Sequence, residues 1–253
     1  MTLRLFLLFA LAAAAPAGDM PFAGKWKANM EKSDFGQMTV AIESLPGGEW
    51  QTVAFGITAK YRMDGKDYPD GMGGTISWKP VDANTWQTVE KANGKVTETD
   101  TFQLSADGKT LTQVSKTMKV DGGSIDGTTV FSRASAGSGL AGKWSTKKVS
   151  GGSGTVEYVA SGSDGLIYKD LDQGMTCDGK LDGKDYPCTG PMVPPGFTVA
   201  MKGSGRTLDF TVKKDGKPFF SASATVAADG KSMTETVTPA AGGDKYKIVY
   251  DRM

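Results

Sequence analysis

Residues 23–26 read Ala-Gly-Lys-Trp, and residues 141–144 repeat these four letters 118 positions later. The hexapeptide Asp-Gly-Lys-Asp-Tyr-Pro at 64–69 recurs at 182–187 with the same offset. A repeat of this length is the size of a whole domain. Solenoids and propellers, by contrast, repeat every 20 to 50 residues or so. The sequence therefore predicts two copies of one domain.

The ends of the two copies also match. Residues 130–133 read Val-Phe-Ser-Arg, and residues 249–252 read Val-Tyr-Asp-Arg. Between the copies, residues 134–139 read Ala-Ser-Ala-Gly-Ser-Gly, a composition typical of a flexible linker. We therefore expect the units to span 18–133 and 140–253.

The pattern within each copy predicts strands joined by tight turns. The chain has 34 glycines, and many follow Asp or Asn, a pair that favours the turns of β-hairpins. Between these turns apolar and polar residues alternate, as in Leu208-Asp209-Phe210-Thr211-Val212, which indicates half-buried antiparallel strands. We expect an all-β fold of two tandem antiparallel meander barrels with about nine strands each, because barrel closure removes exposed strand edges.

The first 17 residues have the features of a cleaved signal peptide. Arg4 precedes an apolar run over 5–15, and Ala15-Pro16-Ala17 offers the small residues that signal peptidase recognises. The run is shorter than the roughly 20 residues needed to span a bilayer. The sequence thus predicts a periplasmic or secreted protein without a membrane anchor.

Charge and composition argue against several classes of function. Without residues 1–17 the chain has 28 basic and 28 acidic residues and no basic cluster, so neither nucleic acid nor an anionic membrane is an expected partner. The chain has no histidine, which removes the commonest general base and zinc ligand. We predict no metal site, no cofactor and no catalytic residue, although an exported enzyme of unknown chemistry stays an alternative.

The only two cysteines, Cys177 and Cys188, lie in one short segment of the second copy. In an exported protein such a pair predicts a disulfide. The chain-entropy model assigns a loop of about 12 residues roughly 3 kcal/mol of stabilisation. The first copy has Ala59 and Asp70 at the corresponding positions, so the disulfide belongs to one copy alone.

The ends of each copy resemble those of lipocalins and the wider calycin group. Each copy begins with Gly-Lys-Trp, which contains Trp26 or Trp144, and ends with Arg133 or Arg252. The chain thus resembles a bacterial exported protein with tandem lipocalin-like barrels. This resemblance implies a structural role for these four residues. In that family the tryptophan packs across the base of the barrel, and an arginine from the end of the chain stacks on it in a cation–π contact.

Two readings are open for the repeated hexapeptide. Its Asp-Gly can simply form a turn, with the tyrosine covering the barrel end, or Tyr68 and Tyr186 can form the lip of a binding mouth. Two readings are also open for Glu98 and Lys116: their strand faces can point into the barrel or lie on the solvated outside. The remaining expected ligand contacts are large lumen residues, represented by Trp86 and Phe210.

The resemblance implies that one or both barrels bind a small apolar or amphipathic ligand. Large residues at the expected lumen positions could instead fill the barrels completely. The alternative is then a non-catalytic interaction or envelope-associated module, whose protein partner the sequence does not identify.

Overall fold

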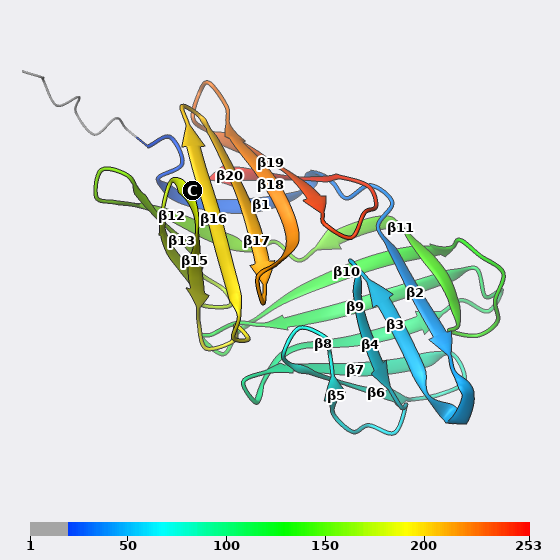
Figure 1. The fold of residues 1–253 in the computed structure, drawn as a ribbon. Coiled ribbons are helices and arrows are strands. Elements are labelled where there is room, and N and C mark those ends of the chain that lie inside the picture. Colours follow the sequence, from blue (N-terminus) through cyan, green and yellow to red (C-terminus); the bar gives the residue numbers. More distant parts are fainter. Residues whose placement is uncertain (1–19) are drawn as a thin grey trace, which may run out of the picture.

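The computed structural model describes residues 20–253, and the predicted signal peptide lies outside this range. Twenty strands form two antiparallel sheets, each curved into a barrel (Figure 1). The predicted all-β fold with two antiparallel barrels is therefore confirmed. Each sheet contains ten strands, one more than expected, because the Tyr-Pro segment of the hexapeptide pairs as part of a strand in both barrels.

Barrel 1 consists of the strands β2 to β11, which are consecutive in the sequence. Its order is β4-β3-β2-β11-β10-β9-β8-β7-β6-β5, so β4 and β5 are its two edges. The strands are β2 (Thr39–Ser44), β3 (Trp50–Ala54), β4 (Ile57–Tyr61), β5 (Tyr68–Pro69), β6 (Thr75–Pro80), β7 (Thr85–Ala92), β8 (Lys95–Leu104), β9 (Thr110–Met118), β10 (Ser124–Arg133) and β11 (Gly142–Gly151).

Barrel 2 is a closed barrel in which β1 completes the circle between β12 and β20. Each remaining strand pairs with its neighbour in sequence. The strands are β1 (Gly24–Asp34), β12 (Thr155–Ser161), β13 (Gly165–Asp170), β14 (Met175–Lys180), β15 (Asp182–Thr189), β16 (Phe197–Ser204), β17 (Thr207–Lys214), β18 (Lys217–Val226), β19 (Ser232–Pro239) and β20 (Tyr246–Arg252).

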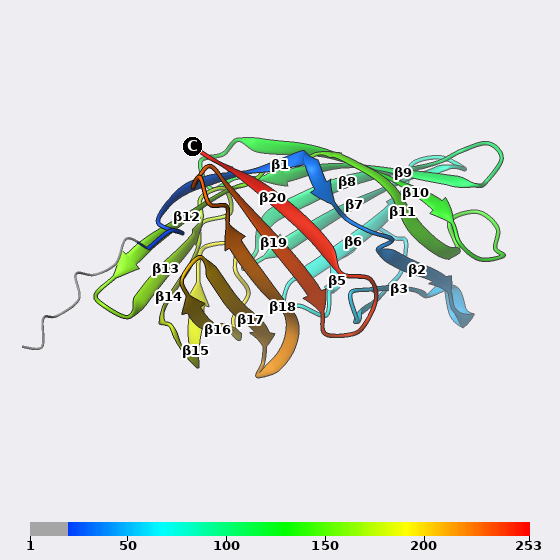
Figure 2. The same cartoon turned by 90° about the horizontal axis from the view of Figure 1, so that it is seen from above.

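The two sequence copies exchange their first strands. β1 belongs to the first copy but lies in barrel 2, whereas β11 opens the second copy and lies in barrel 1. Figure 2 shows β1 and β20 running side by side along one edge of the molecule. The expected units 18–133 and 140–253 thus describe the repeats in the sequence, and the barrels differ from them by one strand each.

The short connection between β10 and β11 accounts for this exchange. Residues 134–139, which composition marked as a linker, lie in the turn of a β10–β11 hairpin. Pairing neighbouring strands closes a short loop at a small entropy cost. β1 and β11 begin with the same Gly-Lys-Trp, so each supplies the tryptophan for the first position of its barrel.

The tryptophan–arginine contacts that the resemblance implies are present, but between copies. The guanidinium of Arg133 lies 4.2 Å from the ring centre of Trp144, and that of Arg252 lies 4.1 Å from Trp26. Both indoles are fully buried and donate a hydrogen bond to a main-chain carbonyl four residues earlier, on Phe22 and Leu140 respectively. Each barrel therefore has one complete tryptophan–arginine plug, built from both copies.

Strand alternation is clearest in β19, where every second residue is buried. Each barrel encloses its own core of buried apolar side chains, one around Trp144 and one around Trp26. In the described part of the chain, no helix is long and apolar enough to cross a membrane.

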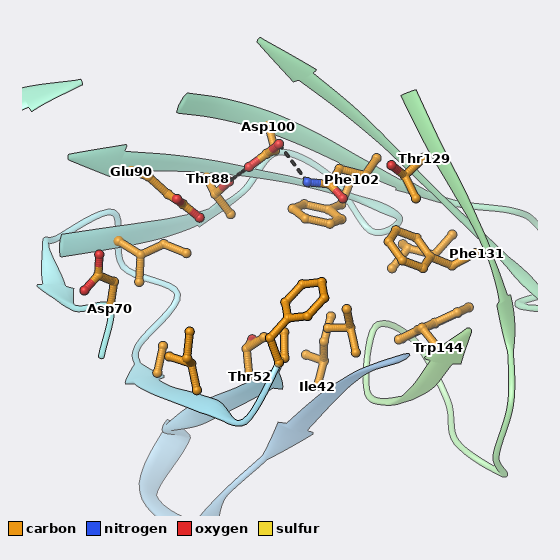
Figure 3. Close-up of a pocket in the computed structure, with 18 of the residues that line it drawn as sticks. Ile42, Thr52, Asp70, Thr88, Glu90, Asp100, Phe102, Thr129, Phe131 and Trp144 are labelled. Carbon is orange, nitrogen blue, oxygen red and sulfur yellow. Dashed lines mark hydrogen bonds between the residues drawn. The ribbon is translucent and has the colours of Figure 1, made fainter. Parts of the chain in front are cut away.

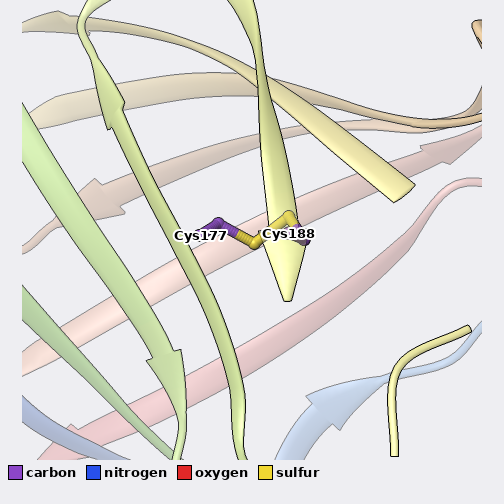
Figure 4. Close-up of a disulfide and its surroundings, with 2 residues drawn as sticks. All are labelled: Cys177 and Cys188. Atoms are coloured by element: carbon purple, nitrogen blue, oxygen red, sulfur yellow. A yellow bond between two sulfur atoms is a disulfide. The ribbon is translucent and has the colours of Figure 1, made fainter. Parts of the chain in front are cut away.

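The two barrels differ at one seam. In barrel 2, β14 pairs with β15, and the predicted disulfide joins Cys177 to Cys188 across this pair (Figure 4). In barrel 1 the equivalent strands, β4 and β5, are the unpaired edges of the sheet. The disulfide prediction is confirmed, and the disulfide lies where barrel 1 remains open.

Candidate functional site

Barrel 1 encloses a cavity of about 470 Å³. Most of its wall is apolar and aromatic, and Trp144 is part of this wall. Figure 3 shows Phe131 and Trp144 toward one end of the cavity and Asp70 and Glu90 toward the other. The cavity is therefore amphipathic, with an apolar end and an acidic end.

Asp100 is the most deeply buried acid of this cavity, with 5% of its surface exposed. It accepts a hydrogen bond from the Thr88 hydroxyl at 2.7 Å and one from the Gln113 amide at 2.8 Å (Figure 3). Glu90 and Glu98 are directly opposite residues on β7 and β8, and Glu98 accepts a hydrogen bond from Thr117. Three carboxyl groups thus share one patch of the inner wall.

Burial disfavours the charged form of these carboxyl groups. It raises the pKa of Glu90 to about 7, and the nearby Asp100 and Asp70 add to the shift. Burial also raises the pKa of Glu98 to about 8, with further contributions from Asp100 and Glu90. A positively charged group would be favourable beside this patch, because its acids repel one another and none of the cavity-lining residues is Lys or Arg.

Three aromatic rings stack along the wall of this cavity. Trp78 lies between Tyr61 and Phe102, with ring centres 5.1 Å and 5.0 Å away. Trp78 is only 2% exposed, and its indole nitrogen has no hydrogen-bond partner within residues 20–253. A buried donor without an acceptor is unfavourable and rare in native structures.

The open seam is covered by the loop that follows β5. The Asp70 carboxylate accepts hydrogen bonds from the main-chain amides of Met72 and Gly74, which fixes this loop. Gly71 has a φ of 81°, and a side chain there would lie 2.9 Å from the carbonyl oxygen of Thr58 on β4. A loop contact therefore replaces the strand pairing that closes barrel 2.

Two apolar side chains of this region line the cavity, Met72 from the same loop and Phe55 from the turn after β3. Phe55 is 40% exposed although it lines the cavity, and it is one of three non-glycine residues with positive φ in the described chain. An exposed aromatic ring at the edge of an apolar cavity offers a contact for an entering ligand.

Barrel 2 is filled by comparison. Its inner cavity measures about 100 Å³, and aromatic side chains occupy its centre. Phe210 contacts Phe220, and Tyr158 contacts Tyr168. The acid that lines this cavity, Glu235, lies among tyrosines, and burial raises its pKa to about 7.

Strand register shows which side chains cause this difference. The pairs Thr88–Asp100 and Glu90–Glu98 in β7 and β8 correspond to Phe210–Ala222 and Val212–Phe220 in β17 and β18. Four inward positions that are polar in barrel 1 are therefore apolar in barrel 2. The same scaffold holds a hollow acidic lumen in one copy and a packed apolar lumen in the other.

The predicted site residues fall into different environments. Glu98 belongs to the carboxyl patch, Trp86 is buried in the core of barrel 1, and Phe210 lines the small cavity of barrel 2. Lys116 is exposed on the same outer face as the exposed Val114, so it lies away from the cavity.

Tyr68 and Tyr186 occupy matching positions at the hexapeptide turns. Each hydroxyl donates a hydrogen bond of 3.2 Å to the first aspartate of its own hexapeptide, Asp64 or Asp182. Neither tyrosine lines the cavity of its barrel. The structure thus brings Glu98 close to the cavity and leaves both tyrosines at the turns.

The ligand contacts predicted from the sequence do not include Thr88, Glu90, Asp70 or Asp100. Alternation within residues 85–92 marks Thr88 and Glu90 as inward, because they share a face with the buried Trp86. A comparison of the two copies at these positions gives the signal that was missed, since polar residues replace Phe210 and Val212.

No known family model matches this sequence, and no curated protein matches it either.

Proposed function

We propose that this protein binds a small amphipathic molecule in barrel 1, and that barrel 2 is a packed scaffold. The single observation that carries this proposal is the difference in lumen volume, about 470 Å³ against about 100 Å³. Cavities that hold small molecules measure about 300–1,000 Å³ and combine an apolar wall with a few polar groups. Barrel 1 meets both conditions, whereas the cavity of barrel 2 is too small.

The lipocalin-like layout supports the same function. A tryptophan plug lies at one end of barrel 1, and the acids and the open seam lie away from it. The alternative of an interaction module with filled barrels fits barrel 2 only. We propose that export, if the predicted signal peptide is used, places this carrier in the periplasm or outside the cell.

A pair of reciprocal variants tests the proposal. Thr88→Phe introduces into barrel 1 the side chain that barrel 2 has at Phe210, and Phe210→Thr makes the opposite change. Binding of a neutral, apolar fluorescent probe and native mass spectrometry of the protein from its own host would be compared for both variants. We expect T88F to lose probe and bound cargo, while F210T retains them with the stoichiometry of the parent protein.

Circular dichroism would establish that both variants are folded. A folded T88F that binds the probe as well as the parent protein would contradict binding in barrel 1. No uptake by the parent protein, together with a native mass equal to that of the bare chain, would count against a carrier altogether.

A further inference from the structure

The cavity of barrel 1 is charged on one side only. Its charged lining residues are Asp70, Glu90 and Asp100, and no basic residue lines it from any described strand or loop. Charged groups in an enclosed, low-dielectric space interact strongly with a ligand of opposite sign. An anionic ligand such as a fatty acid would meet like charges there, whereas a cationic ligand would be attracted.

Two lining groups have unused hydrogen-bonding capacity. The Glu90 carboxyl accepts no hydrogen bond from residues 20–253. Its pKa is shifted only by burial and by the neighbouring charges of Asp100 and Asp70. The indole N–H of Trp78, on the neighbouring strand β6, has no acceptor although the side chain is almost fully buried. Of the two, the Glu90 carboxyl lines the cavity as an acceptor, so a ligand that carries a hydrogen-bond donor beside its apolar body would meet it.

An inorganic metal ion does not fit these observations. Among the described residues, no group of three or more Asp, Glu, Cys or His side chains is placed to hold a metal ion. Phe102 lines the cavity two residues from Asp100 on the same strand, and such an apolar wall favours hydrocarbon over a hydrated ion. The acidic end and the apolar end together require one amphipathic molecule.

We propose that the ligand of barrel 1 is an amphipathic organic amine, whose ammonium group lies between Glu90 and Asp100. Its apolar part extends toward Phe131 and Trp144. This inference rests on the proposed function of barrel 1 as a binding site. It adds the charge of the ligand and its orientation in the cavity.

Octylamine and octanol form a matched pair of probes, since they share one hydrocarbon chain and differ in the head group. At about pH 8 an alkylamine is almost fully protonated. Calorimetric titration of the full mature chain should give a Kd for octylamine at least about ten-fold lower than for octanol, a difference equivalent to 1.4 kcal/mol. This comparison uses the parent protein and needs no variant to fold.

The double variant Glu90→Gln with Asp100→Asn keeps side-chain size and removes the charge. It should bind octanol as the parent does and lose the preference for octylamine. Glu235→Gln in barrel 2 is the matched control and should keep the preference.

If octanol binds as tightly as octylamine, or if the double variant keeps the preference, the amine assignment is wrong while binding in barrel 1 stands. If neither probe binds and T88F also leaves the bound cargo unchanged, the proposed function fails together with the amine assignment.

Discussion

Barrel 1 and barrel 2 share a strand order, a tryptophan–arginine plug and a hexapeptide turn, yet only barrel 1 is hollow. The difference depends on a few inward positions and one seam. Thr88 and Glu90 stand where Phe210 and Val212 fill barrel 2, and the β4–β5 edges stand where β14 and β15 are paired and joined by a disulfide. The comparison shows that a few inward side chains and one seam separate a hollow barrel from a packed one.

Loops of barrel 2 contact barrel 1 near its open seam. The side-chain amide of Asn93 in barrel 1 donates a 3.0 Å hydrogen bond to the carbonyl of Val193 in barrel 2. A side chain at Gly73, in the loop that covers the open seam, would lie 3.3 Å from Pro194. Loops of the packed barrel thus contact the least regular part of the hollow one.

The largest effect should come from removing the tryptophan plugs. Replacement of a fully buried Trp by Ala costs about 3–5 kcal/mol. Because the first strands are exchanged, Trp26→Ala should destabilise barrel 2 and Trp144→Ala should destabilise barrel 1. Hydrogen exchange measured by mass spectrometry would show faster exchange in peptides from β12–β20 for W26A, and in peptides from β2–β10 for W144A.

The two variants are controls for each other. Faster exchange of β2–β10 in W26A, with β12–β20 unchanged, would mean that each copy folds with its own first strand, contrary to the strand exchange.

The strand exchange also marks the limit of prediction from sequence. Alternation, Asp-Gly turns and the 118-residue offset were sufficient for two antiparallel barrels, and the close spacing of the two cysteines was sufficient for the disulfide, because these features depend on local pattern and spacing. The partner of the first strand was not predictable, since β1 and β11 carry the same Gly-Lys-Trp. The seam was missed because strand pairing across β4 and β5 is a long-range property that no local pattern encodes.

The candidate site was predictable in part for a similar reason. Period two places Glu98 and Asp100 on one face of β8, but it does not say which face is inside. The structure places Asp100 inside and Lys116 outside, on a neighbouring strand. Alignment of the two copies identifies lumen positions better, since Thr88 and Glu90 correspond to large apolar side chains.

The second effect in size concerns the seam. Replacing Cys177 and Cys188 by serine removes the crosslink and should lower the free energy of unfolding by about 3 kcal/mol. Chemical denaturation of the double variant measures this loss, and hydrogen exchange in residues 175–189 should increase. Equal exchange in this segment with and without the disulfide would mean that strand pairing alone closes barrel 2.

The reciprocal change places cysteines at Ala59 and Asp70 in barrel 1. Oxidation of this pair should crosslink the open seam and slow the uptake of a fluorescent probe, while the reduced protein serves as its own control. Unchanged uptake after complete oxidation would show that ligands enter elsewhere.

The third effect is a pH dependence of stability that originates mainly in barrel 1. Unfolded glutamate titrates near 4.5, whereas the pKa values of Glu90 and Glu98 are about 7 and 8 in the folded protein. Below pH 4.5 both states are protonated, so no stability is lost. As pH rises toward 8, the unfolded state releases protons more readily, and folding stability decreases.

Because these two groups are only partly buried and interact with each other, we expect a loss of roughly 2 kcal/mol between pH 5 and 8. Urea denaturation at several pH values measures it. The Glu90→Gln with Glu98→Gln variant should reduce the slope, and Glu235→Gln should remove a further part that comes from barrel 2. An unchanged slope in all three substitutions would mean that these carboxyl groups are ionised in the folded protein.

The smallest effect should be equal in the two barrels. Tyr68→Phe and Tyr186→Phe each remove one exposed hydrogen bond of 3.2 Å, to Asp64 and Asp182 respectively. A net contribution of about 0.5 kcal/mol or less is expected from such a bond, since water replaces the lost partner. Neither tyrosine lines a cavity, so probe binding should be unchanged in both variants. A loss of binding in Y68F alone would restore the binding-lip interpretation of the hexapeptide for barrel 1. Equal small losses of stability in both variants, with binding unchanged, would mean that the hexapeptide is part of the shared scaffold.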